Sequence, residues 1–104
     1  MEYTLHTHHL ELTAADATLL DKKLERLQKH LHPPFTVNIG IKRDAHHRSG
    51  DIITCTITVN HRKKTIHAER TSNTVQDCID EVIQALTNEL EKDHGKAKDN
   101  HSSY

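Results

Sequence analysis

The apolar residues of this chain follow two different spacings, and the order of those spacings restricts the fold. In two segments they recur every three or four residues, which is the pattern of a helix with one buried face. In four other segments they alternate with polar residues, which is the pattern of a strand with one buried face. The helical segments are residues 13–31 and 74–90, and the alternating segments are residues 2–9, 35–42, 52–60 and 64–70. The order β-α-β-β-β-α predicts an α+β domain with both helices packed on one face of a four-stranded sheet, similar to double-stranded-RNA-binding domains.

The first helix has clear limits. Thr13 followed by Asp16 resembles a capping box with Asp in place of the usual Glu, so the helix is expected to begin there. Pro33 and Pro34 prevent its continuation beyond about Leu31. Its predicted buried stripe consists of Ala17, Leu20, Leu24, Leu27 and Leu31.

The second helix is expected to bury a similar stripe and to end near Gly95. The predicted stripe consists of Val75, Ile79, Val82, Ile83, Leu86 and Leu90. Residues 96–104 show no apolar pattern and are predicted to form a flexible tail. A chain of 104 residues suits one domain with one core, so we expect a single domain over residues 1–95.

The composition indicates a cytoplasmic protein. The sequence contains neither a long apolar run, as a membrane helix requires, nor a secretory signal at its start. Its two cysteines, Cys55 and Cys78, are interpreted as reduced thiols rather than a disulfide. Cys55 is predicted to point inward from its strand, and Cys78 to lie at the rim of the second helical stripe.

The charges are unevenly distributed along the chain although the net charge is −1. Residues 42–70 hold seven basic and three acidic side chains, which gives a net charge of +4. Residues 74–93 hold one lysine and six carboxylates, which gives a net charge of −5. The second helix is therefore predicted to be acidic, in contrast to the rest of the domain.

Four cations of the first helix gather on one part of its outer face. Lys22, Lys23, Arg26 and Lys29, here called the basic strip, span an arc of about 120° at roughly 100° per residue. Such a strip is either an ordinary solvated helix face or a surface for nucleic-acid phosphates, since cations one turn apart can meet successive phosphates. The strip alone does not distinguish these two readings.

The sequence offers little support for an enzyme or a metal site. Eleven histidines are present, but none has the ligand spacing of a zinc site, and they are interpreted as exposed, neutral side chains. The three glycines lie too far apart to cradle a phosphate, and nothing marks a nucleophile. We therefore expect no catalytic residue, no metal and no cofactor.

The open face of the predicted sheet argues against one mode of RNA binding. Threonines dominate this face, and aromatic residues make up only 3% of the chain. Binding of RNA bases by stacking on the sheet is therefore not expected. Any nucleic-acid recognition is expected to use basic residues of the helix and loops.

Three segments resemble the family of ribosome hibernation-promoting factors, whose members include the ribosome-associated inhibitor protein Y and are also called sigma-54 modulation proteins. "HLELTAAD" at residues 9–16 is similar to the family's "V-E-I-T" segment before the first helix. "KLERLQK" at residues 23–29 is similar to its "K-L-x-K-L-x-K". "IHAERTSNTVQDCIDEVIQALTNELEK" at residues 66–92 resembles its "I-H-A" and "A-I-D-x-L-I-x-K-L". The likeness extends over most of residues 3–96.

The resemblance implies a translation inhibitor that binds the small ribosomal subunit and its rRNA under stress or in stationary phase. It would occupy the channel for messenger RNA and transfer-RNA anticodon ends. The absence of a long acidic extension and of a second domain is similar to short family members, which act with a ribosome-dimerising partner factor. Off the ribosome we expect a monomer, with no membrane partner. Lys23, Arg26 and Lys29 stand at positions where the family has cations on its first helix, and Lys92 and Lys96 where it has lysines late in the second. With Lys22, these are the predicted RNA-binding residues.

Other positions depart from the family pattern. Gln76 replaces an aromatic residue, and Ala85 and Asn88 replace a lysine and an arginine. Glu89 and Glu91 make the second helix more acidic than the resemblance implies. Two alternatives therefore stay open: a free-standing double-stranded-RNA-binding module, or a protein-interaction domain that uses the acidic second helix.

Overall fold

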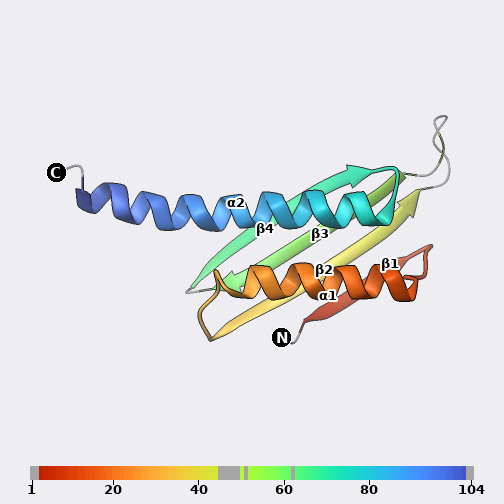
Figure 1. Ribbon diagram of the computed structural model, residues 1–104, viewed down its shortest axis with the longest axis horizontal. Helices are drawn as coiled ribbons and strands as arrows, with labels where there is room; N and C mark the ends of the chain where they lie inside the picture. The colour runs from red at the N-terminus through yellow and green to blue at the C-terminus, as the bar shows by residue number, and fades with distance from the viewer. Residues whose placement is uncertain (1–2, 45–49, 51, 62, 103–104) are drawn as a thin grey trace.

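The computed structural model describes residues 3–44, 50, 52–61 and 63–102, with the backbone alone for residues 93–102. Its elements follow the predicted order. They are β1 (Thr4–His8), α1 (Ala14–Gln28), β2 (Phe35–Asp44), β3 (Ile52–His61), β4 (Lys64–Ser72) and α2 (Val75–Ser102). Figure 1 shows α1 and α2 side by side on one face of the sheet. The predicted α+β architecture is therefore confirmed.

The four strands form one sheet in the order β1-β2-β3-β4. β1 is parallel to β2, and the other two pairs are antiparallel. The parallel pair follows from the connection through α1, because parallel neighbours need a long crossover. The antiparallel pairs follow from direct connections between consecutive strands.

The core lies between the sheet and the two helices. The inward side chains of the strands alternate with outward polar ones, as the sequence predicted. The largest fully buried side chains are Leu20, Leu24, Leu27, Ile39, Ile41, Ile53, Ile57, Val59, Ile79, Val82, Leu86 and Leu90. This layer fixes the rotation of each helix, and so decides which side chains of α1 and α2 face solvent.

The start of α1 has the predicted capping box. The Thr13 hydroxyl accepts the Asp16 backbone N–H at 3.1 Å, and the Asp16 carboxylate accepts the Thr13 N–H at 3.1 Å. One member of the predicted stripe is wrong, because Ala17 is exposed. Asp16, on the other flank of the stripe, is buried instead, since its carboxylate turns back toward Thr13.

α2 is longer than the sequence indicated. Its capping hydroxyl belongs to Thr74, which accepts the Asp77 backbone N–H at 3.1 Å. The predicted end at Gly95 is wrong, because the helix continues to Ser102 and extends past the sheet (Figure 1). One glycine in a helix costs only about 1 kcal/mol relative to alanine, and its neighbours here include good helix formers. The flexibility of residues 96–104 stays a prediction.

Both cysteines are free thiols inside the core. Cys55 points inward from β3 as predicted, whereas Cys78 is fully buried rather than at the rim. The Cys78 sulfur lies 3.1 Å from the Arg70 carbonyl oxygen and 3.4 Å from the Ile53 carbonyl oxygen, so its single S–H proton has two acceptors within reach. A hydrogen bond with Cys78, together with burial, raises the pKa of Cys55 above its usual value. Cys55 therefore stays protonated and packs as a small apolar side chain.

The outer face of the sheet is polar. One row across it contains Thr4, Asn38, Thr58 and His67 in register. Hydrogen bonds connect Thr4 with Asn38, and Thr58 with His67 at 3.0 Å. The helices leave this face uncovered in Figure 1. In the described part of the chain, no helix carries an apolar stretch long enough to cross a membrane.

Candidate nucleic-acid interface

Three of the four basic-strip residues lie on the outer face of α1. Burial of Leu20, Leu24 and Leu27 turns the opposite side of the helix toward solvent. Lys22, Arg26 and Lys29 are exposed on that side. Lys29 is the C-cap residue, and its backbone N–H donates to the Arg26 carbonyl at 3.3 Å. All three positions therefore belong to one rigid element, which holds the three charges in a row.

Lys23 has a different environment from the rest of the strip. Its Nζ lies 3.0 Å from the Asp80 carboxylate of α2, and its side chain is only 26% exposed. Lys23 therefore differs from the exposed cations Lys22, Arg26 and Lys29, because it is half-buried and paired with Asp80. The two helices lie close enough for this flank of α1 to meet α2, and Asp80 neutralises the lysine there.

A shallow hollow marks where the first turns of the helices adjoin. Its volume is about 440 Å³, and it is lined by Ala14, Ala15, Thr18, Leu19, Lys22 and Gln76. Gln76, which departs from the family pattern, thus lies on the same surface as Lys22. The structure joins this part of α2 to the basic strip, although more than fifty residues separate them in the sequence.

The cations of α2 are fewer and farther along the helix. Lys92 is 69% exposed, and its Nζ lies 3.7 Å from the Glu89 carboxylate one turn earlier. An exposed pair at this distance contributes little to stability and is readily exchanged for another partner. Lys96 lies on α2, but its side chain is outside the described part of the structure.

The exposed surface of α2 is mostly acidic. Its exposed carboxylates are Asp77, Asp80, Glu81, Glu89 and Glu91. Among the side chains that the structure describes, the exposed part of α1 and the exposed part of α2 therefore differ in sign, and the continuous row of cations lies on α1. Ala85 is half-buried, whereas Asn88 is exposed and accepts a hydrogen bond from the Gln84 side chain at 3.0 Å.

Among the described histidines, His61 does not fit the expectation of exposed side chains. His61 is 5% exposed, and its Nε2 accepts the backbone N–H of His32 at 2.9 Å. Nε2 therefore carries no proton in this state. The alternation of β3 could have predicted that His61 is buried, since His61 points to the same side of the strand as the buried Ile57 and Val59. Within the described residues, no group of three histidine, cysteine or carboxylate side chains is placed to hold a metal ion.

The arrangement of elements is shared with two solved structures. The N-terminal domain of Thermus thermophilus protein Y is 17% identical with a TM-score of 0.72, and the match covers 88% of this chain and 98% of that one. A ribosomal subunit interface protein from Coxiella burnetii is 18% identical with a TM-score of 0.73, and the match covers 91% of this chain and 99% of that one. At these identities the likeness establishes the fold alone.

Comparison of the sequence with curated proteins gives no match. The family model described as Sigma 54 modulation protein / S30EA ribosomal protein matches residues 3–98. The match covers nearly the whole chain of 104 residues and agrees with the resemblance found in its motifs. The chain therefore belongs to the Sigma 54 modulation protein / S30EA ribosomal protein family.

Proposed function

We propose that this protein is a cytoplasmic translation inhibitor that binds the small ribosomal subunit under stress or in stationary phase. It would occupy the decoding channel for messenger RNA and transfer RNA and silence the ribosome reversibly, without a reaction or a cofactor. The observation that carries the proposal is the row of exposed cations Lys22, Arg26 and Lys29 on α1, in a chain of this family.

The physical argument rests on the phosphates of rRNA. A rigid row of cations releases condensed counterions when it meets a phosphate backbone, and this release supplies binding that does not depend on sequence. Inhibition then follows from occupancy of the channel, so a small folded domain suffices. The likeness to a ribosomal subunit interface protein supports the same partner.

The contribution of the other predicted cations is smaller in this proposal. Lys23 contributes only if it exchanges Asp80 for a phosphate, and Lys92 only if it leaves Glu89. Lys96 remains part of the proposed RNA-binding set. A ribosome-dimerising partner factor would act on the assembled ribosome, and the protein itself would be monomeric off the ribosome.

The first test is sedimentation with ribosomes through sucrose gradients. The protein should travel with small subunits and whole ribosomes at low salt and dissociate as salt is added. Recovery of the protein only at the top of the gradient at low salt would refute the ribosomal proposal.

The second test reverses the charge of the α1 row. Lys22→Glu, Arg26→Glu and Lys29→Glu together should abolish inhibition in a cell-free translation system. Because each phosphate contact contributes about 0.9 to the slope of log affinity against log salt, the slope should flatten by roughly two to three. Exposed charge changes usually alter stability by about 0.5 kcal/mol or less each, so thermal unfolding should change little.

The matched control changes three charges on the other helix. Conversion of Asp77, Glu81 and Glu91 to lysine should leave inhibition intact. A folded α1 variant that inhibits as well as the wild type would show that α1 does not face RNA. If the α2 variant alone lost activity, a protein-interaction domain would be the better reading. Equal affinity for naked duplex RNA and for the subunit would favour the free-standing RNA-binding module.

A further inference from the structure

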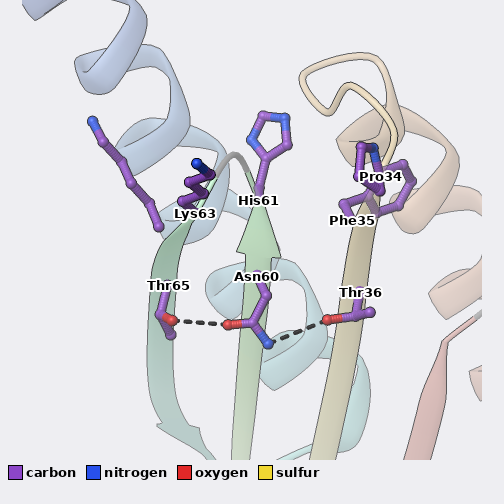
Figure 2. A pocket seen from close by; sticks show the side chains of 8 residues that line it. Pro34, Phe35, Thr36, Asn60, His61, Lys63 and Thr65 are labelled. Atoms are coloured by element: carbon purple, nitrogen blue, oxygen red, sulfur yellow. Dashed lines mark hydrogen bonds between the residues drawn. The ribbon is translucent and has the colours of Figure 1, made fainter.

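An open hollow lies at the end of the sheet where β2 begins and β3 turns into β4 (Figure 2). Its volume is about 580 Å³, which is within the range of roughly 300–1,000 Å³ for sites that hold small ligands. Its lining residues include Pro34, Phe35, Thr36, Asn60, Lys63 and Thr65. None of the basic-strip residues lines it, so the hollow is separate from the proposed RNA interface on α1.

One part of the wall is apolar and aromatic. Pro34 and Phe35, the only phenylalanine of the chain, stand together at the start of β2 in Figure 2. Phe35 is half-buried, because one part of it packs against the core while another part lines the hollow. A ring held in this way offers a fixed surface on which a flat ligand can pack.

Another part of the wall, on the outer face of the sheet, is a fixed hydrogen-bonding group. The Asn60 side-chain N–H donates to the Thr36 hydroxyl at 3.2 Å, and the Thr65 hydroxyl donates to the Asn60 carbonyl oxygen at 2.8 Å. These two bonds, drawn in Figure 2, orient the amide across three strands. An amide has a second N–H and a second lone pair, so Asn60 presents a donor and an acceptor in a set direction.

The rim of the hollow is positive. Lys63 of the β3–β4 turn and Lys64 at the start of β4 both line it, and none of its described lining residues is a carboxylate. Lys63 is exposed and has a φ of 65°, a left-handed conformation that fixes the turn. A ligand that complements these features needs a negative group beside a flat ring with hydrogen-bonding edges.

We infer that this hollow binds a nucleotide, with the base against Phe35 and Pro34, its edge on Asn60 and its phosphate at Lys63. The nucleotide can be free or an unpaired nucleotide of RNA, since the two share this chemistry. The RNA source rests on the proposed function, whereas binding of a free nucleotide does not depend on it.

The test uses the full chain labelled with ¹⁵N and follows backbone and side-chain amide signals during titration. One arm adds adenosine or uridine monophosphate to millimolar concentration, and a second adds a single-stranded oligoadenylate. Signals of Asn60, Lys63 and Thr65 should shift in both arms. If the oligonucleotide alone shifts them, the source is RNA, and the inference holds in that form.

Two variants keep the fold and remove one interaction each. Phe35→Leu keeps an apolar side chain against the core, and loss of base stacking should weaken binding about tenfold. Lys63→Asn removes the charge with a residue that tolerates left-handed backbone, and should weaken binding about fivefold. Lys42→Asn removes one exposed charge near the far end of β2 and should leave affinity unchanged.

Several results would overturn the inference. Failure of both ligands to shift these signals is one, and equal weakening by Lys42→Asn and Lys63→Asn is another, since it would indicate nonspecific charge. A short polyglutamate peptide that shifts the same signals as strongly would show that the hollow takes acidic chains rather than nucleotides. If binding to the small ribosomal subunit persisted under any of these three results, the proposed function would still stand.

Discussion

The ion pair between Lys23 of α1 and Asp80 of α2 leads to a specific prediction, because it neutralises one cation of the basic strip. Lys23 Nζ lies 3.0 Å from Asp80, and the two side chains are 26% and 48% exposed. Asp80→Asn breaks the pair while keeping the size of the side chain. A pair with this exposure is worth about 0.2–1 kcal/mol, so the variant should remain folded and lose at most that much stability.

The same change should strengthen binding to the ribosome. It frees Lys23 for a phosphate, which adds about 0.9 to the slope of log affinity against log salt. Relative to about 1 M salt, where the ionic contribution vanishes, one such contact is worth about eightfold in affinity at about 0.1 M. The slope and the affinity should be measured together, by fluorescence anisotropy of labelled protein with small subunits over a series of salt concentrations.

Two controls separate the freed lysine from the change in net charge. Glu81→Gln removes one exposed carboxylate from the next position of α2 and should leave the slope unchanged. Asp80→Asn combined with Lys23→Gln should return the slope to its wild-type value. If Asp80→Asn and Glu81→Gln gave the same slope, Lys23 would not meet a phosphate and the reasoning would fail.

Other expected outcomes concern stability, titration and the second helix. Thr13→Ala removes the capping hydroxyl of α1 and should lower the free energy of unfolding in urea by about 1 kcal/mol. Burial and the hydrogen bond to Asp21 raise the pKa of Tyr3 above 10.0, so its contribution to stability should be complete below pH 10.0 and be lost as pH rises further. Urea unfolding above pH 10.0 should detect this loss in the wild type and not in Tyr3→Phe. Both cysteines should react with a thiol reagent only as fast as the core opens, because neither is accessible in the folded state. Asn88→Arg with Ala85→Lys should tighten subunit binding in a salt-sensitive way, and no change would show that this part of α2 does not face RNA.

Much of the fold was predictable because its signals are local. The alternation of β2 and β3 identified their inward faces, and the spacing of Leu20, Leu24 and Leu27 identified the buried face of α1. The exchange of hydrogen bonds between Thr13 and Asp16 involves residues only three positions apart, so sequence spacing suffices to predict it. Family membership was predictable for a related reason, since its motifs are short segments in a fixed order.

The parts that the sequence did not determine depend on elements that are distant along the chain. Helix geometry placed Lys23 at the edge of the basic strip, but only the packing of α1 beside α2 gave it Asp80 as a partner. The burial of His61 depends on the loop at His32. The hollow beside His61 requires the start of β2, the end of β3 and the start of β4 to lie together. Periodicity reports which face of an element is buried. It does not report which side chain of another element lies against that face, because the tertiary packing of the whole domain decides that.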